Sequence, residues 1–138
     1  IKVITKSGTP KSKITVLHCT SEYPAAFKNI NLLAMKSMQK KLNVSVGYSD
    51  HTLGSEVSIA AVALGARVIE KHFTISRKLI GPDHKSSLEP NELKELNNAI
   101  RNIEKSFGKV IKSPTQSEKK TKSIVRKSIV ALKLIRKG

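Results

Sequence analysis

The sequence has few of the residues on which several classes of protein depend. Its single cysteine, Cys19, excludes an internal disulfide and is typical of a reducing compartment, so we expect a cytoplasmic protein. There is no tryptophan, and aromatic residues make up 4% of the chain, which argues against the stacking platforms of proteins that bind single-stranded nucleic acid. No apolar run approaches the roughly 20 residues of a transmembrane helix. Residues 1–13 lack the apolar core of a signal peptide.

Acidic residues are also scarce. The chain contains 26 Lys and Arg but only 10 Asp and Glu, which gives a formal net charge of +16. Such a charge raises nucleic acid or an anionic membrane as a partner. The lysines are spread along the chain and densest at its two ends, which favours a solvated surface that would also attract phosphate-bearing substrates. We therefore expect neither nucleic acid nor membrane as a partner, and keep a basic, non-catalytic binding module as the alternative function.

The apolar residues follow a pattern that switches between strand and helix. The 138 residues suffice for one domain with a core. Strands are expected at 14–17, 44–48 and 67–70, and helices at 32–42, 56–64 and 90–107. Asn31 is the expected N-cap of the first of these helices, and Gly65 the stop signal of the second. Strand and helix alternating three times predicts an α/β fold with parallel strands and right-handed crossovers.

The two ends of the chain differ from this pattern. Ile1–Thr5 is expected to be the tail of a helix, and Lys6–Lys13 a linker. Residues 109–122, rich in Lys, Ser, Thr and Pro, are expected to form an exposed linker, and residues 128–134 a strand or the start of another module. Because the chain neither starts with Met nor stops at a terminating element, we expect a piece of a longer protein. Three strand–helix units would then form an open sheet or part of an eight-unit barrel, which takes roughly 250 residues.

Polar residues gather after each predicted strand, where parallel α/β proteins build their sites. The loop after the first strand carries Thr20 to Tyr23, and Ser49 to His51 follow the second. His72 follows the third, with Asp83 and Lys85 further along. His51 and His72 are the first choice for metal ligands, because neutral imidazole is the commonest metal ligand in proteins. The alternative is that each imidazole only bonds neighbouring backbone.

Other candidates also have two interpretations each. Ser49 and Asp50 would bind phosphate or orient His51, or else cap the helix that follows. Tyr23 would bind a sugar-like substrate or fasten its own loop. Asp83 would accept hydrogen bonds from substrate hydroxyls or shape the turn in which it lies.

A last group of residues is expected to be structural or solvent-facing. His18 ends a strand and is expected to be structural, and Cys19 to be a small buried residue. His84 and Lys85 are expected to face solvent from the long loop 75–87. Lys71 is the only lysine beside a strand-end candidate, so it carries the possibility of an aldolase with lysine chemistry. Strand alternation turns it away from His72, which disfavours that mechanism.

Five ordered motifs carry a resemblance to a known family. They lie at residues 18–24, 47–54, 61–66, 70–74 and 81–84. In order and spacing they resemble the sialic acid synthases, which make N-acetylneuraminic, legionaminic and pseudaminic acids for cell-surface polysaccharides. The resemblance covers about residues 14–131 and implies the last three units of a (β/α)8 TIM barrel followed by an antifreeze-like (SAF) domain. On this basis residues 1–108 would belong to the barrel, 109–125 to the linker, and 126–138 to the start of the second domain.

The resemblance also implies a reaction and a set of roles. The family are transferases (EC 2.5.1 type) that form a C–C bond between phosphoenolpyruvate and an N-acetylated amino sugar, such as N-acetylmannosamine, with Mn²⁺ or Mg²⁺. His51 and His72 would be catalytic metal ligands, Ser21 and Ser49 would contact phosphoenolpyruvate, and Tyr23 and Asp83 would bind the sugar. The longer parent protein would be a homodimer. The 138-residue chain alone would be inactive, because the family's other substrate contacts come from outside it.

Overall fold

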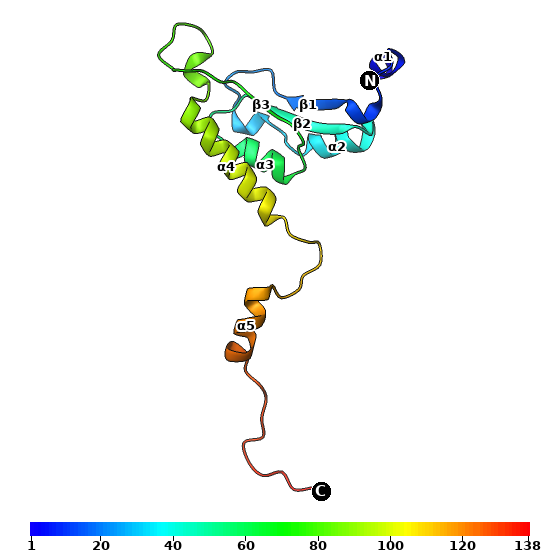
Figure 1. Ribbon diagram of the computed structural model, residues 1–138, viewed down its shortest axis with the longest axis vertical. Helices are drawn as coiled ribbons and strands as arrows, with labels where there is room; N and C mark the ends of the chain where they lie inside the picture. The colour runs from blue at the N-terminus through cyan, green and yellow to red at the C-terminus, as the bar shows by residue number, and fades with distance from the viewer. The chain divides into compact units, whose positions relative to one another are not determined.

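The computed structural model describes the whole chain apart from the side chain of Ser123, and it separates into two compact units, residues 1–107 and 108–138. In the first unit, three strands form one parallel sheet in the order β1-β2-β3 (Figure 1). They are β1 (Thr15–Cys19), β2 (Ser45–Asp50) and β3 (Ile69–Lys71). The predicted α/β class with parallel strands is confirmed. The assignment of residues 126–138 to an antifreeze-like domain stays a prediction.

Three helices lie on one side of this sheet (Figure 1). They are α2 (Ala34–Leu42), α3 (Glu56–Ala63) and α4 (Pro90–Ser106). Both α2 and α3 contact β2, and α4 packs against α3. Pro90 lies in the first turn of α4, where its fixed φ suits a helix start, and the side chains of Glu89 and Glu92 form a reciprocal capping box.

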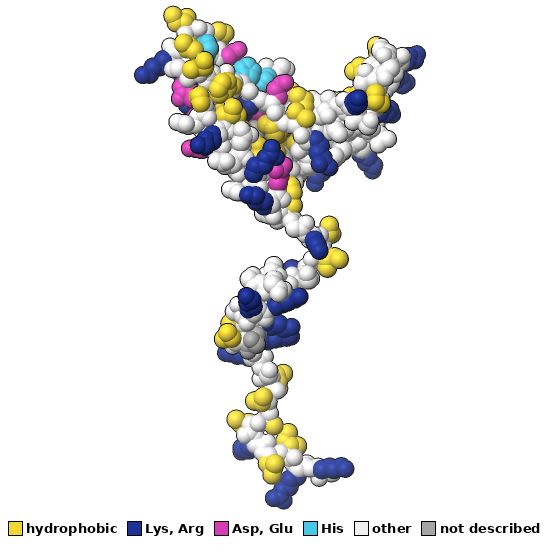
Figure 2. All heavy atoms as spheres, in the orientation of Figure 1, with side chains coloured by type: hydrophobic (Ala, Val, Ile, Leu, Met, Phe, Trp, Pro, Cys, Tyr) yellow, Lys and Arg dark blue, Asp and Glu magenta, His cyan; other side chains and the backbone are white. Residues whose placement is uncertain are grey.

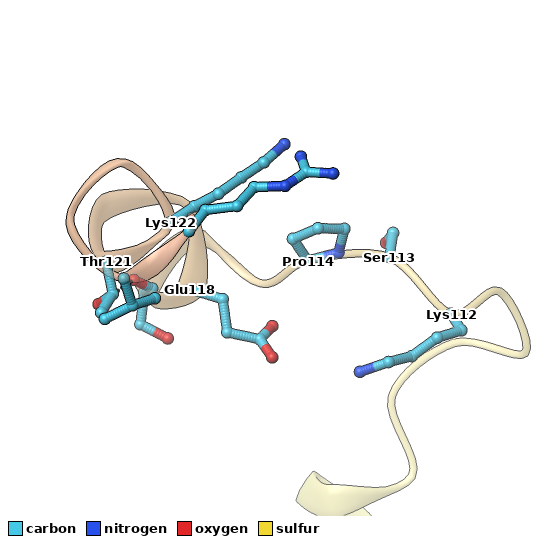
Figure 3. Close-up of a pocket in the computed structure, with 9 residues that line it drawn as sticks. Lys112, Ser113, Pro114, Glu118, Thr121 and Lys122 are labelled. Atoms are coloured by element: carbon cyan, nitrogen blue, oxygen red, sulfur yellow. Dashed lines mark hydrogen bonds between the residues drawn. The ribbon is translucent and has the colours of Figure 1, made fainter. Parts of the chain in front are cut away.

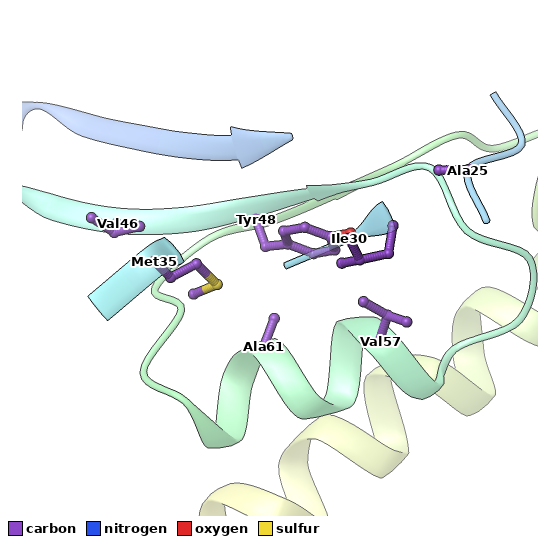
Figure 4. Close-up of a cluster of buried hydrophobic side chains, with 7 residues drawn as sticks. All are labelled: Ala25, Ile30, Met35, Val46, Tyr48, Val57 and Ala61. Carbon is purple, nitrogen blue, oxygen red and sulfur yellow. The ribbon is translucent and has the colours of Figure 1, made fainter. Parts of the chain in front are cut away.

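The core fills the space between β2 and the helices (Figure 4). Val46 and Tyr48 of β2 point toward Val57 and Ala61 of α3, while Met35 of α2 closes one end of the cluster. Ala25 and Ile30 come from the loop between β1 and α2 and complete it. Because strand residues alternate between faces, this packing turns Gly47 and Ser49 to the opposite face of the sheet.

Gly47 marks the closest approach between the strands. A Cβ built at this position would lie 2.5 Å from the carbonyl oxygen of Val68 and 2.5 Å from Cδ2 of Leu17. The same Val68 oxygen accepts a hydrogen bond of 2.8 Å from the backbone N–H of Tyr48. A side chain at residue 47 would therefore clash with the Val68 carbonyl, which hydrogen-bonds β2 to the segment before β3.

Several predicted boundaries are shifted. Asn31 does not cap α2, because it adopts a left-handed conformation (φ 51°) and the helix begins at Ala34, after an N-cap at Leu33. A short polar side chain makes Asn one of the few residues that tolerate this conformation. The stop at Gly65 is confirmed. With φ 101°, Gly65 donates to the carbonyl of Val62 and Ala66 donates to that of Ala61, the two bonds of a Schellman motif.

The chain termini also depart from expectation. The predicted helix at the start is present as α1 (Lys2–Lys6). The linker expected over 109–122 stays a prediction, and its second half is helical: α5 (Gln116–Val125) begins with a capping box between Thr115 and Glu118. None of the described residues after Val125 forms a strand, so the strand expected at 128–134 is wrong. An apolar run needs a neighbouring strand to complete its hydrogen bonds, and the second unit offers none among the described residues.

Candidate active site

Two histidines meet at the carboxyl ends of β2 and β3. The last pair in the register of these strands is Asp50 beside Lys71, so His51 and His72 follow at the same level. Their ring centres lie 5.2 Å apart with the planes at 85°. Tyr23, from the loop after β1, stacks on His72 at 3.9 Å and meets His51 edge-on at 5.3 Å. The structure thus joins side chains from three successive strand ends into one aromatic cluster.

The loop of residues 75–87 adds a carboxylate to this cluster. An Oδ of Asp83 lies 3.9 Å from Nδ1 of His72. The two ends of the loop are joined, because Leu88 donates to the carbonyl of His72 and Thr74 donates to that of Leu88. The hydroxyls of Tyr23 and Ser87 are 3.3 Å apart, which fastens the loop after β1 to this second loop. Tyr23 therefore both contacts the histidines and holds its surroundings in place.

Arg77 fastens the same loop to the start of α4. Its Nε donates to the carbonyl of Ser87 at 3.0 Å, and its guanidinium pairs with Glu92 at 2.6 Å. Its backbone N–H donates to the carboxylate of Glu89. A hydrogen bond from the backbone N–H of Glu89 lowers the pKa of Glu92, and the Arg77 cation lowers it further. A long loop that would otherwise be free to move is in this way tied at its base.

Ser49 is accompanied by an acidic residue that sequence reasoning missed. Ser49 is buried on the same face of β2 as His51, and its hydroxyl donates to the carboxylate of Glu70 at 2.6 Å. Glu70 is the register partner of Ser49. Alternation along β3 places Glu70 and His72 on one face, so the signal was present in the sequence once the strand was recognised.

Asp50 belongs to the other face of the sheet. Its carboxylate is fully buried and accepts hydrogen bonds from the N–H and hydroxyl of Thr52, from the hydroxyl of Ser58 and from the ammonium of Lys71. Neither Ser49 nor Asp50 caps α3, whose N-cap is Ser55. Lys71 points away from His72, as alternation predicted, and its burial in an ion pair speaks against lysine chemistry with a substrate.

Of the remaining candidates, one has a structural hydrogen bond and two are exposed near the strand ends. His18 has the expected structural role, because its Nε2 lies 2.8 Å from the carbonyl oxygen of Ile30. Cys19 is exposed and not buried as predicted, with Sγ 3.8 Å from the ring nitrogens of His51. The error has a simple cause: β1 extends to Cys19, so this residue lies at the open strand end. Ser21 is exposed in the following loop, and no hydrogen bond joins it to the described side chains of the cluster.

The loop that carries Asp83 is more ordered than the sequence suggested. His84 was expected to face solvent, but its Nδ1 lies 2.8 Å from the hydroxyl of the buried Thr74. The segment His84–Ser86 forms a single 3₁₀ turn that follows Asp83 directly. This turn gives Asp83 a defined backbone position beside the histidines.

The two histidines have a geometry that suits a shared ion. Imidazoles that bind one ion at a metal–nitrogen distance of about 2.1 Å have ring centres about 5 Å apart when the angle at the metal is near tetrahedral. The observed separation of 5.2 Å fits this arrangement. Among the described residues there is no group of three or more His, Cys, Asp or Glu side chains placed to hold a metal. Two protein ligands from this chain would leave positions for water, substrate or other residues.

Neither the charge on one face of the molecule nor the hollow of the second unit brings other candidate residues together. On the face shown in Figure 2, Lys and Arg side chains are scattered and the histidines lie near acidic side chains. The second unit has a hollow of about 730 Å³ (Figure 3). It is lined by Lys112, Ser113, Pro114, Ser117, Glu118, Thr121, Lys122, Val125 and Arg126. This open hollow contains none of the candidate residues. Among the described residues, no helix has the length and apolar character needed to cross a membrane.

Comparison with known proteins identifies the family. The family model described as "NeuB family" matches residues 1–112, which is most of the chain. The chain belongs to the NeuB family. The N,N'-diacetyllegionaminic acid synthase of Campylobacter jejuni is 55% identical over 138 residues, which cover 100% of this chain and 41% of that protein. Human N-acetylneuraminate-9-phosphate synthase is 40% identical over 123 residues, covering 88% of this chain and 34% of that protein.

Solved structures support the same membership of the NeuB family. The N-acetylneuraminic acid synthetase of Leptospira borgpetersenii, solved in complex with citrate, matches with a TM-score of 0.74 and 37% sequence identity. That match covers 89% of this chain and 42% of the solved chain. The chain thus spans between about one third and two fifths of the length of these relatives. The predicted resemblance is confirmed, and the fold is that of part of the family's α/β structure.

Proposed function

We propose that this chain is the site-bearing later part of the barrel of a nonulosonic acid synthase. The whole protein would condense phosphoenolpyruvate with an N-acetylated amino sugar and release phosphate. The observation that carries the proposal is the meeting of His51, His72, Tyr23 and Asp83 at the strand ends of a NeuB-family chain. The relatives named as legionaminic and N-acetylneuraminate-9-phosphate synthases support this class of reaction.

His51 and His72 would hold a divalent ion, Mn²⁺ or Mg²⁺. Their ring separation and their exposure to the open side of the strand ends support this role. When bound there, the ion would act as a Lewis acid toward the aldehyde oxygen of the sugar. Tyr23, which stacks on one imidazole and lies edge-on to the other, would keep the two rings in this mutual orientation.

The other side chains would position the two substrates. Ser49, held by Glu70, would offer its hydroxyl to phosphoenolpyruvate, and Ser21 would contact the same substrate from the exposed loop. Asp83 would accept hydrogen bonds from hydroxyls of the amino sugar, and Tyr23, which stacks on the same His72, would also contact the sugar. Convergence of such groups on reacting atoms is how a protein supplies positioning and charge stabilisation.

The proposed reaction balances without a redox partner. The terminal carbon of the phosphoenolpyruvate double bond attacks the aldehyde carbon, one C–C bond forms, and the C=O π bond breaks so that the aldehyde oxygen takes up a proton and becomes a hydroxyl. Water adds to the carbon that bears the phosphate, where positive charge has developed. The resulting tetrahedral centre then expels phosphate by breaking its C–O bond and becomes a ketone. A transferase of this kind would be cytoplasmic and, in its full-length form, a homodimer.

The test is phosphate release from phosphoenolpyruvate by the full-length protein that carries this chain. It would be measured with N-acetylmannosamine and with its 6-deoxy diamino relatives, in Mn²⁺ and then in chelator. We expect release that requires sugar and stops on chelation. His51→Gln and His72→Gln should abolish it, whereas His18→Gln, which changes a histidine outside the cluster, should retain it in whatever fraction stays folded. Sugar-independent release, or none with any of these sugars, would refute the proposal.

A further inference from the structure

A buried ion pair lies directly behind the two histidines. Asp50 and Lys71 are the residues immediately before His51 and His72, and they are register partners at the ends of β2 and β3. The Lys71 Nζ lies 3.0 Å from the Asp50 carboxylate, and the two side chains are 5% and 0% exposed. The pair therefore joins the same two strand ends that carry the proposed metal ligands, on the opposite face of the sheet.

The pair is held by a wider set of hydrogen bonds. The Lys71 ammonium also donates to the carbonyl of Thr52 at 2.7 Å. The Asp50 carboxylate accepts from the N–H and hydroxyl of Thr52 at 2.9 and 2.7 Å, and from the hydroxyl of Ser58 on α3 at 2.5 Å. Through these contacts the residues on both sides of His51 and the residue before His72 share one bonded network. The network fixes the backbone positions from which both imidazoles project.

Stability alone is a weak reason for such a pair. Burying two charges is costly, and well-packed apolar residues often replace a buried ion pair without loss of stability. The remaining advantage of the pair is geometric, because a charged contact with several fixed hydrogen bonds tolerates little change in the spacing of the groups it joins.

We propose that the Asp50–Lys71 pair is a positioning device that sets the separation and orientation of His51 and His72 for a shared divalent ion. This inference rests on the proposed function, in which the two histidines bind one ion. Asp50 and Lys71 are positioning residues in this proposal, since they contact the strand ends and not the ion or the substrate. Partners that hydrogen-bond metal ligands change metal affinity by about 10–100-fold when they are replaced, and for a pair that acts through the backbone we expect the lower end of that range.

The test separates stability from metal binding with three variants of the full-length protein. Asp50→Asn and Lys71→Met each leave one buried charge without its partner, so both should be destabilised. Asp50→Asn/Lys71→Met removes both charges, and it should regain most of the lost stability in urea unfolding. Mn²⁺ affinity would be measured by the electron paramagnetic resonance signal of free Mn²⁺, without substrates. We expect the double variant to bind Mn²⁺ about tenfold or more weakly than wild type.

The controls make the outcomes distinguishable. Arg101→Gln breaks an exposed ion pair with Glu104 on α4 and should change neither stability nor Mn²⁺ affinity appreciably. If His51→Gln and His72→Gln bind Mn²⁺ as wild type does, the proposed function loses its metal site. If those variants lose binding but the double variant binds as tightly as wild type, the positioning role is refuted.

If the double variant does not fold, the variant Lys71→Arg tests the positioning role of the Asp50–Lys71 pair. Lys71→Arg keeps the positive charge and so preserves the fold, but its planar, larger head group cannot reproduce the contacts of the ammonium with Asp50 and Thr52. We expect a folded protein with a lowered unfolding midpoint and reduced Mn²⁺ affinity. Unchanged affinity in folded Lys71→Arg would overturn the proposal.

Discussion

Replacing Tyr48 by Phe should make the protein more stable. Tyr48 is fully buried in the core between β2 and α3, and its hydroxyl has no hydrogen-bond partner among the described residues. Phenylalanine would keep the ring, its packing against Val57 and Ala61, and its contact with the ring of His18 at 5.7 Å. Only the unpaired oxygen would be lost.

The size of the effect follows from the cost of burying an unpaired hydroxyl. A buried polar group without a partner costs about 1–3 kcal/mol. Because phenylalanine removes that group and leaves the ring in place, we expect Tyr48→Phe to raise the free energy of unfolding by about 1 kcal/mol at neutral pH. Urea unfolding of the full-length protein would measure the difference.

The pH dependence gives a second, independent measurement on the same variant. Burial raises the pKa of Tyr48 well above its ordinary value of 10.0, and the nearby Asp50 adds to the shift. The unfolded chain therefore releases the phenol proton above about pH 10, while the folded protein keeps it. Stability from this group is complete below that pH and falls above it by about 1.4 kcal/mol per pH unit. The advantage of Tyr48→Phe should grow accordingly between pH 10 and pH 11.

Tyr23→Phe is the matched control. Its hydroxyl lies 3.3 Å from that of Ser87, so its removal should cost stability instead of adding it. The reasoning would be refuted if Tyr48→Phe were less stable than wild type at neutral pH, or if the difference between them did not change above pH 10. Either result would mean that the Tyr48 hydroxyl has a partner in the intact protein.

Three other changes test the fold directly. Gly47→Ala should destabilise the full-length protein by about 1–3 kcal/mol in urea unfolding, because its Cβ would lie 2.5 Å from the Val68 carbonyl; unchanged stability would show that the strands can separate. Arg77→Ala should speed proteolytic cleavage within residues 75–87 and raise the KM for the sugar, with the exposed Lys78→Ala as control; equal cleavage rates would contradict the role of Arg77. The 138-residue chain alone should lack phosphate-releasing activity and a cooperative thermal transition, because β1 and β3 leave open sheet edges; cooperative unfolding as a monomer would disprove this.

Local patterns were sufficient to predict the three strands and the polar residues that gather near their carboxyl ends. Apolar β-branched runs gave the three strands, and the polar residues after them include the side chains that meet in the cluster of Tyr23, His51 and His72. Strand alternation also assigned Lys71 to the face away from His72. Strand position and strand alternation depend on residues that are adjacent in the chain, so both can be read from a single sequence.

The contacts between strands were not predictable in the same way. The pairing of Asp50 with Lys71 and of Ser49 with Glu70 depends on the register of β2 against β3, which no local pattern specifies. The order in the loop of residues 75–87 likewise depends on Arg77 finding Ser87 and Glu92. In contrast, α5 was missed although its signal was present, because Thr115 followed by Glu118 is a capping box at the head of a lysine-rich segment.

The packing of β2 limits how the proposed substrate site can be engineered. Val46, Tyr48 and Asp50 are committed to the helix side of the sheet, while Gly47 and Ser49 are committed to the other side. A random library over this strand would therefore yield mostly unfolded clones, whatever substrate was used for selection. Diversity is better introduced at the tip of the loop of residues 75–87, where Ile80 is fully exposed and Leu79 about half exposed. An altered substrate preference could be sought there without disturbing β2, the strand that ends immediately before His51.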